Sequence, residues 1–435
     1  MVLFAGIAGW KTGPFLVSPL AALLGLILMY QLARQFGLSR PYALTACLLL
    51  AAYPLYLFIA LQPMSDVLAT LWVMTAVLAA MRSRKKKAWA ILSGAAFGIS
   101  VLVRPLNALI LLPLLSALPW SPAVLGLFAL SGLPFAIFMG AANNALYGSP
   151  LTTGYRGEIS ANLAWRYFPA RFQFYGHWLS ASLTPIIPLA WLGMPADRRQ
   201  SVKDRLLLFL WFAPLFLFYC FYAPYQGWWF LRFFLPSLPA LILSALLVIR
   251  DGSEALKYRL HTDRPWTRGL NVIAAALIAV VLIGEVRQIK KLGVPETDKF
   301  ESVYKNSCLT VRETLPAKSV ILSMFLGGAI TYYTNFIPCR WDSVNPDSFR
   351  VLRRRVESCG YRWYALLFPF EEEQFQARAP GAWEKIRNID FVSLWRLVPE
   401  ARPQRLKRRG KKPRNKPAGG VLRRQDLGTF SESLE

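Results

Sequence analysis

The chain has 435 residues, is 55% hydrophobic, has a mean hydropathy of +0.35 and carries a formal net charge of +26 at pH 7. Soluble domains are about 45–50% apolar, and here the excess is concentrated in long, nearly charge-free runs within the first two-thirds of the chain. These runs exclude a soluble protein with buried helices. The positive charge is therefore interpreted through its distribution along a membrane protein, and no nucleic-acid partner is expected.

The apolar runs predict about ten membrane-spanning segments, because roughly 20 apolar residues cross a ~30 Å hydrocarbon core. The continuous runs are residues 15–36, 42–61, 67–81, 89–103, 122–142, 179–194, 206–222, 233–249 and 270–284. A further run, residues 106–118, is shorter and contains Pro113, which predicts a short or broken span.

Basic clusters predict which ends of these segments are cytoplasmic, because Lys and Arg accumulate on that side of the membrane. The clusters expected in the cytoplasm are residues 82–87, 197–205 and 250–268. All three clusters lie on the cytoplasmic side only if residues 106–118 also cross the membrane. The segments then expected to face outward are residues 62–66, Arg104, 143–178, 225–232 and everything after Glu285. The N-terminus is also expected outside, without a cleavable signal peptide, which leaves open a native start further upstream.

Three regions follow from this pattern. Residues 1–286 are expected to form a helical membrane domain with one large external loop, residues 143–178. Residues 287–400 predict a small, extracytoplasmic α/β domain with a mostly parallel sheet. Residues 401–435 are rich in Arg, Lys, Pro and Gly, which predicts a disordered basic tail that is either solvated or in contact with anionic headgroups.

Within the α/β domain the elements are expected to alternate. Helices are predicted over residues 300–313, 327–335, 353–360 and 370–386, and strands over residues 319–325, 361–370 and 391–398. Three of the five cysteines lie here: Cys308, Cys339 and Cys359. A disulfide among them is possible in an oxidising compartment, but the sequence does not pair them. With only two histidines and no Cys/His spacing, a zinc site is not expected.

Polar residues at the outer ends of the predicted spans are the candidates for a functional site. Asp66 begins a span, Arg104 precedes Pro105 at a turn, and Arg232 follows Trp228 and Trp229 at the outer end of a late span. Arginine holds phosphate through a rigid fork of donors, and a carboxylate serves as a base or a metal ligand. Structural interpretations stay open: a first-turn charge for Asp66, interfacial anchors for the arginines and an aromatic belt for the tryptophans.

Four stretches carry a resemblance: residues 51–79, 92–113, 143–155 and 228–245. They resemble bacterial GT-C-type membrane glycosyltransferases of the dolichyl-phosphate-mannose–protein mannosyltransferase group (glycosyltransferase family 39-like). The first has an acidic residue at an outer turn, the second an Arg-Pro turn after a Gly-rich span, and the third an external-loop signature. The fourth has a late Arg-aromatic-aromatic-Leu-Pro pattern. Residues 323–375 also look like the α/β tail domain of some members, so the resemblance extends over most of residues 15–400.

The resemblance implies transfer of a sugar from a polyprenyl-phosphate carrier to a lipid, glycan or protein acceptor, on the outer face of the cytoplasmic (inner) membrane. Carried over by match, Asp66 is the acidic residue that positions the donor, with a divalent cation as a possible helper. Arg104 and Arg232 are the candidate phosphate holders, with Trp228 and Trp229 beside them. Tyr155 and Arg156 are expected on the acceptor side.

One departure affects the catalytic role. The family has a further acidic residue in an earlier external loop, whereas nothing acidic precedes Asp66 here. Either the start is truncated, or Asp66 serves alone as the catalytic carboxylate, or the protein is not catalytic. The rival functions are a secondary transporter or flippase, which predicts inverted repeats and broken spans meeting at the midplane, and a non-catalytic membrane assembly protein.

Overall fold

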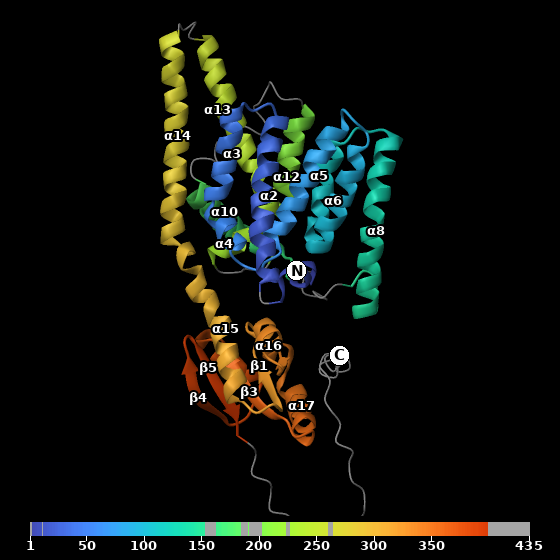
Figure 1. Ribbon diagram of the computed structural model, residues 1–435, viewed down its shortest axis with the longest axis vertical. Helices are drawn as coiled ribbons and strands as arrows, with labels where there is room; N and C mark the ends of the chain where they lie inside the picture. The colour runs from blue at the N-terminus through green and yellow to red at the C-terminus, as the bar shows by residue number, and fades with distance from the viewer. Residues whose placement is uncertain are drawn as a thin grey trace, which may run out of the picture. The chain divides into compact units, whose positions relative to one another are not determined.

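The computed structural model describes residues 2–10, 12–152, 162–183, 190, 202–222, 227–259 and 264–398 (Figure 1). The chain divides into two compact units, which are described separately. The helical unit comprises Met1–Pro295 and the sheet unit begins at Glu296.

The helical unit consists of α-helices and short 3₁₀ segments in its described residues. In its first half these are α1 (Val2–Ala8), α2 (Gly13–Gln35), α3 (Arg40–Ala52), α4 (Pro54–Ala60), α5 (Asp66–Ser83), α6 (Trp89–Val103), η1 (Pro105–Ile110), α7 (Leu111–Ala117) and α8 (Pro122–Tyr147). In its second half they are η2 (Trp165–Tyr167), α10 (Phe168–Leu183), α12 (Val202–Cys220), η3 (Trp228–Ser237), α13 (Leu238–Arg259), α14 (Arg264–Lys291) and η4 (Val294–Glu296).

Prolines mark where several of these helices begin or break. Tyr53 is extended before Pro54, because the ring of a proline disfavours the helical conformation in the residue before it. As a result α3 and α4 meet at an angle of 64° within one apolar segment. Pro122 opens α8 after Ser121, whose side chain caps the helix by accepting from the Val124 amide.

Four helical stretches are long and apolar enough to cross a membrane, and the bent pair of α3 and α4 would make a fifth crossing, within the part of the chain that is described. The four are Gly13–Gln35, Asp66–Ser83, Pro122–Tyr147 and Trp228–Ala255. The protein is therefore a multi-pass membrane protein. The total of about ten spans stays a prediction, because the run at residues 179–194 lies mostly outside the described residues.

The expected external loop at residues 143–178 is partly helical. Helix α8 continues to Tyr147, and α10 begins at Phe168 and runs to Leu183. Both ends of the predicted loop are thus helical, and its outward orientation stays a prediction. Apolar content located the segment boundaries in the sequence, whereas the helical backbone continues past the apolar residues.

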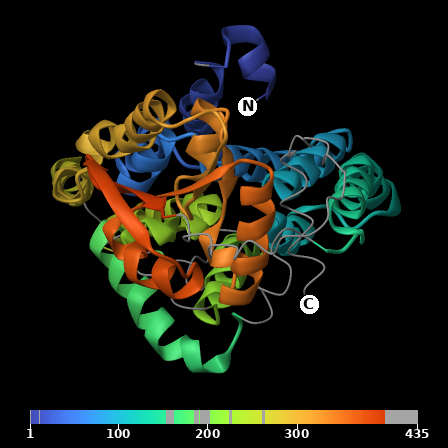
Figure 2. The same ribbon diagram turned by 90° about the horizontal axis from the view of Figure 1, so that it is seen from below.

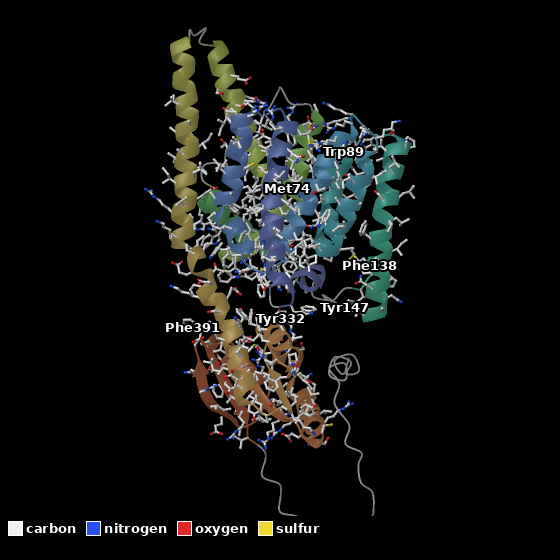
Figure 3. The ribbon with its side chains drawn as sticks, viewed as in Figure 1. Met74, Trp89, Phe138, Tyr147, Tyr332 and Phe391 are labelled. Carbon is white, nitrogen blue, oxygen red and sulfur yellow. The ribbon has the colours of Figure 1, made fainter. Side chains whose placement is uncertain are left out.

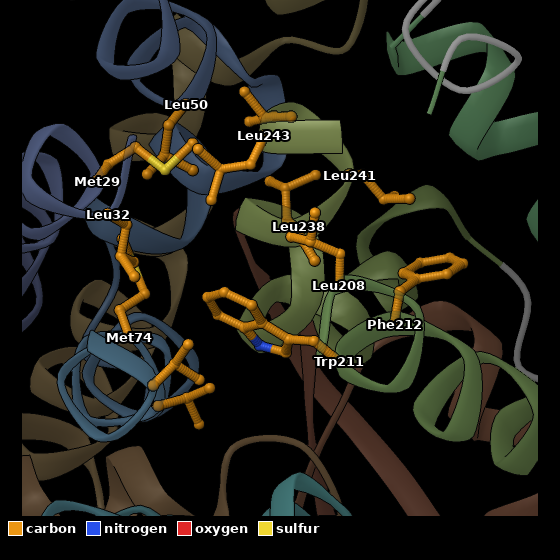
Figure 4. Packing of buried hydrophobic residues seen from close by; sticks show 14 of the residues in the cluster. Met29, Leu32, Leu50, Met74, Leu208, Trp211, Phe212, Leu238, Leu241 and Leu243 are labelled. Carbon is orange, nitrogen blue, oxygen red and sulfur yellow. The ribbon is translucent and has the colours of Figure 1, made fainter. Parts of the chain in front are cut away.

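The core of the helical unit is formed by helices that are far apart in the sequence. Met29 and Leu32 of α2, Met74 of α5 and Trp211 of α12 are fully buried and belong to one apolar cluster (Figure 4). The Trp211 indole N–H donates to the Pro236 carbonyl at 2.9 Å, so its one polar atom is satisfied. Helices α8 and α14 lie at opposite ends of this unit in both views (Figures 1 and 2).

The sheet unit holds five strands and the helices between them. Its elements are α15 (Thr297–Thr314), β1 (Ser319–Leu322), α16 (Gly327–Tyr333), β2 (Ile337–Cys339), η5 (Trp341–Ser343), α17 (Pro346–Ser358), β3 (Arg362–Leu367), η6 (Pro369–Glu371), α18 (Glu372–Arg378), β4 (Trp383–Ile389) and β5 (Val392–Leu397). The strand order is β2-β1-β3-β5-β4. Helix α17 begins with a capping box, in which Asn345 and Ser348 exchange side-chain hydrogen bonds with each other's amides.

The sheet differs from the predicted one in two respects. Strands β2, β1 and β3 are parallel, but β5 pairs antiparallel with both β3 and β4, so the sheet is mixed rather than mostly parallel. Residues 383–386 belong to strand β4 and not to the helix expected over residues 370–386. The helices predicted around residues 300–313 and 327–335 and the strand at residues 391–398 are confirmed. All five cysteines are free thiols.

Candidate functional site

Asp66 is the first residue of α5 and lies almost completely buried, with 4% of its surface exposed. The turn before it is fixed by the Ser18 hydroxyl of α2, which donates to the Met64 carbonyl at 3.0 Å. The Thr70 hydroxyl, one turn further along α5, donates to the Asp66 carbonyl at 2.8 Å. Asp66 is thus held at a helix end by contacts from two helices.

Arg104 is the partner of Asp66. It ends α6 in an extended conformation, because Pro105 follows it and disfavours the helical conformation. That turn directs the guanidinium to α5, where its Nη1 donates to Asp66 Oδ1 in an ion pair. The pair joins residues 38 positions apart and is mostly shielded from solvent, with side-chain exposures of 18% and 5%.

A second guanidinium approaches the same place from η3. Arg232 Nη1 contacts the Met64 sulfur at 3.3 Å, two residues before Asp66. Both guanidiniums lie against one aromatic ring, since the Phe233 centroid is 5.6 Å from the central carbon of Arg104 and 5.7 Å from that of Arg232. A cation within about 6 Å of a ring centroid is attracted by the ring's π electrons. Phe233 therefore links the two arginines.

Tyr219 of α12 completes this cluster. Its ring is stacked on Phe233, with centroids 4.4 Å apart and planes 6° apart. Tyr219 covers one face of the Phe233 ring. The two guanidiniums therefore approach the ring from its other face or its edge. The cluster of Asp66, Arg104, Arg232, Phe233 and Tyr219 is thus built from α5, α6, η3 and α12.

The two predicted tryptophans have different surroundings. Trp228 packs on Phe58 of α4, with ring centroids 5.0 Å apart, and belongs to the border of the apolar core. Trp229 is 42% exposed and touches Trp228 edge to face at 6.5 Å. Trp228 is thus a packing residue of this region, and Trp229 presents its indole to the outside of the unit, as an interfacial tryptophan does. Tyr155 and Arg156 lie outside the described residues.

The chemistry of the cluster is anion recognition next to a carboxylate. Arginine binds phosphate oxygens through parallel N–H donors, and the Asp66 carboxylate lies directly against one of the two guanidiniums. For a divalent cation the fit is poor: across the described ranges, no group of three or more His, Cys, Asp or Glu side chains is placed to hold a metal. A cation at Asp66 stays a prediction, and no chemical step below depends on it.

Three residues of the site were not predicted from the sequence: Met64, Tyr219 and Phe233. The signal for Asp66, Arg104 and Arg232 was a charge within apolar sequence. Phe233 and Tyr219 give no such contrast, because they are two among 28 Phe and 17 Tyr in the chain.

Both the sequence and the fold resemble known proteins. Residues 3–141, which contain both Asp66 and Arg104, match the family described as dolichyl-phosphate-mannose-protein mannosyltransferase. The chain is also similar to ArnT from Cupriavidus metallidurans. The crystal structure of ArnT bound to undecaprenyl phosphate has 14% sequence identity and a TM-score of 0.58, over 93% of this chain and 87% of that one.

The chain shares its fold with this ArnT structure. The apo crystal structure of ArnT gives the same result, with 13% identity and a TM-score of 0.53 over 87% of this chain and 82% of that one. No curated protein matches the sequence. The resemblance predicted from the four sequence stretches is confirmed, and two of the stretches lie inside the matched residues 3–141.

Proposed function

We propose that the protein is a membrane glycosyltransferase that moves a sugar from a polyprenyl-phosphate-linked donor to a lipid, glycan or protein acceptor on the outer face of the cytoplasmic membrane. The observation that carries the proposal is the buried Asp66–Arg104 ion pair beside Arg232. It lies within a fold shared with an ArnT structure bound to undecaprenyl phosphate. In the proposed reaction, the two arginines bind the carrier phosphate. Asp66 serves alone as the catalytic carboxylate and acts on the acceptor, instead of only positioning the donor as the resemblance implies.

The reaction is a direct displacement at the anomeric carbon of the sugar. The acceptor hydroxyl oxygen attacks this carbon from the side opposite the phosphate, and its proton passes to the Asp66 carboxylate. The bond between the anomeric carbon and the phosphate oxygen breaks, and the polyprenyl phosphate leaves with the electron pair of that bond. The configuration at the anomeric carbon is inverted.

Arg104 and Arg232 stabilise the charge that develops on the leaving phosphate. Preorganised donors aimed at a developing charge are usually the largest single contribution to catalysis. Phe233 holds both guanidiniums on one ring, and the Asp66 carboxylate fixes the direction of Arg104. Both arginines are thus oriented by neighbouring groups before a carrier binds, which lowers the ordering cost of binding.

The position of the polar residues favours this function over a transporter. Asp66 is the first residue of α5 and Arg104 is the last-turn cap of α6, so the pair lies where two apolar helices end. A transporter would gather its polar groups near the middle of the membrane, at broken helices. The bend between α3 and α4 is caused by Pro54. Helix α4 contributes an apolar packing residue, Phe58, to this region and not a polar group.

The test is a transfer assay with the full chain in lipid nanodiscs, supplied with undecaprenyl-phosphate-linked sugars and membranes of the source organism as acceptor. Released undecaprenyl phosphate and the glycosylated product are quantified by mass spectrometry. We expect Asp66→Asn to reduce transfer by about 10²-fold or more, as removal of a general base typically does.

The matched control is Asp204→Asn. Asp204 pairs with Arg84 in a more exposed ion pair that also joins two helices of this unit, at the other end of α5. The Asp204→Asn variant should leave transfer unchanged, because partly exposed ion pairs contribute little to stability. Wild-type release of undecaprenyl phosphate no faster than that of Asp66→Asn, with every sugar tried, would contradict the proposal.

A further inference from the structure

The sheet unit exposes phenylalanine side chains along one edge of its sheet. Strands β1 and β3 are parallel, and β4 points the same way as β3 because both are antiparallel to β5. The carboxyl ends of β1, β3 and β4 therefore meet at one edge. The segments that leave these ends carry Phe325, Phe370 and Phe391, which are 48%, 64% and 66% exposed. We call these three residues the aromatic edge.

The opposite edge of the sheet has a different chemistry. The residues just before β1, β3 and β4 include Lys318, Gly360 and Gly381, which are all exposed. Among the described residues, the large apolar side chain exposed at that edge is Val398, at 38%. Apart from Phe300 of α15, which is 60% exposed, the exposed phenylalanines of the described sheet unit thus lie at one edge.

Packing within the unit holds two of the three rings in place. Phe325 meets Phe370 at 5.3 Å between ring centroids, and Phe370 stacks on Phe368 at 5.5 Å. Phe368 in turn contacts Tyr304 of α15 at 5.8 Å, and both pack against the buried core. The outward rings therefore have a fixed support. Exposed apolar surface that is held in this way marks an interaction site.

The polar groups beneath the aromatic edge are already satisfied inside the unit. Glu371 accepts hydrogen bonds from the Met324 amide, the Trp341 indole and the Phe368 amide at 2.9–3.2 Å. Ser323 Oγ accepts from the Leu326 amide at 3.1 Å. A sugar-binding site needs polar groups that converge on the ligand, whereas these converge on the unit's own backbone and indole. An apolar partner fits this edge better than a carbohydrate.

The chain enters the sheet unit at this same edge. Helix α15 ends at Thr314, only four residues before β1 begins at Ser319, so α15 runs antiparallel to β1 and starts near the carboxyl ends of the strands. The contact between Tyr304 and Phe368 fixes that direction. Of the three residues of the aromatic edge, Phe391 is labelled in Figure 3.

The connection to the preceding helix is short. Helix α14, which contains the predicted span 270–284, ends at Lys291, and α15 begins at Thr297. The five residues between them reach at most about 17 Å even if fully extended. Because the predicted span ends only seven residues before α14 does, the sheet unit follows this span closely along the chain.

We propose that the aromatic edge of the sheet unit docks into the headgroup–acyl boundary of the bilayer that the helical unit spans. Aromatic side chains are enriched at this boundary, and an apolar surface binds there by burying its area. The aromatic edge anchors the sheet unit at three points contributed by three different segments. This binding is independent of the transferase activity and stands if that activity is absent.

The test is photo-crosslinking of the full chain in nanodiscs made of a defined phosphatidylcholine and phosphatidylglycerol mixture. The photoreactive p-benzoyl-phenylalanine replaces Phe325, Phe370 or Phe391 in separate variants. Because these side chains are exposed and the new residue is also aromatic, folding should be preserved. We expect lipid adducts on the peptides that carry these positions, measured by mass spectrometry, about ten-fold above the control variant.

The control is the same photoreactive residue at Val351, in α17. Val351 is 49% exposed, against 48% for Phe325, so solvent access is matched while the position lies off the aromatic edge. Lipid adducts at Val351 equal to those at the three phenylalanines would overturn the proposal. So would adducts at the three phenylalanines that contain only glycan or protein fragments and no lipid.

Discussion

At the scale of single residues, the Asp66–Arg104 pair has two roles: it stabilises the fold and it takes part in the proposed chemistry. Comparing the single variant with the double variant distinguishes these roles. Arg104→Leu leaves the Asp66 carboxylate buried without its partner, and breaking a buried ion pair in this way typically costs about 3–5 kcal/mol. We expect this variant to unfold at a clearly lower temperature, measured for the purified protein in detergent by differential scanning fluorimetry.

The double variant Asp66→Leu with Arg104→Leu should recover most of that stability, because replacing both partners of a buried pair by apolar side chains is often neutral. Transfer activity should stay lost, because both proposed chemical groups are gone. A double variant that regains activity together with stability would show that the pair is structural only. A double variant as unstable as Arg104→Leu would contradict the geometry of the pair.

The thiols of the sheet unit give a second prediction at this scale. Burial raises the pKa of the Cys308 and Cys339 thiols to about 12. Since only the thiolate reacts and about one thiol in ten thousand is ionised at pH 8 with such a pKa, both cysteines should resist alkylation in the folded protein. Raising the pH towards 12 should speed their reaction.

Iodoacetamide labelling followed by peptide mass spectrometry measures this directly, with the denatured chain as the fully labelled reference. Rapid labelling of Cys308 at pH 8 in the folded protein would contradict its burial, and rapid labelling of Cys339 would contradict its raised pKa.

At the scale of elements, α6 and α8 pack closely against each other at two glycines. A Cβ atom added to Gly94 would overlap the backbone carbonyl of Phe128, and Gly132 lies directly across from Gly94. Small residues let two membrane helices approach closely in this way. We expect Gly94→Ala to destabilise the helical unit by about 1–3 kcal/mol, because overpacking forces backbone shifts.

Gly126→Ala is the matched control for Gly94→Ala. Like Gly94, Gly126 lies inside a helix, in this case α8. A Cβ atom added to Gly126 would meet no atom within 4 Å. Its substitution should be neutral or stabilising by about 0.5–1 kcal/mol, because alanine favours the helix over glycine. Thermal unfolding in detergent compares the two variants, and equal effects would disprove the close approach.

Elements were predictable from the sequence where one signal dominated. The apolar runs predicted α2, α5 and α6 to within a few residues, because nothing competes with uninterrupted apolar sequence in a membrane. Strand β4 was missed because five of its seven residues are exposed and include Glu384, Lys385 and Arg387, which read as a charged helix. Edge strands carry such charges because they discourage pairing with other chains.

The same reasoning explains which parts of the site the sequence predicted. Asp66 and Arg104 stand out as charges beside apolar helices, and both lie at helix ends where a proline or a turn precedes or follows. Their mutual contact was not predictable, because it joins residues 38 positions apart and depends on how α5 packs against α6. Strand β2 was missed for a local reason: it has three residues, and one of them is Pro338.

At the scale of the whole molecule, the proposed carrier should stabilise the helical unit. The arginine cluster is built from α5, α6, η3 and α12, which all belong to that unit. A ligand at 100 times its dissociation constant stabilises the state that binds it by about 2.7 kcal/mol. Undecaprenyl phosphate should therefore raise the unfolding temperature of the helical unit.

Hydrogen exchange by mass spectrometry, recorded as a function of temperature, reports on the two units separately in the intact protein. Undecaprenol, which has the same chain without the phosphate, should give a much smaller shift, because the guanidiniums recognise the phosphate. Arg232→Leu should reduce the shift given by undecaprenyl phosphate to that of undecaprenol. Equal shifts for both lipids in the wild-type protein would mean that the helical unit binds only the apolar chain, and the arginines would then have no role in holding a carrier phosphate.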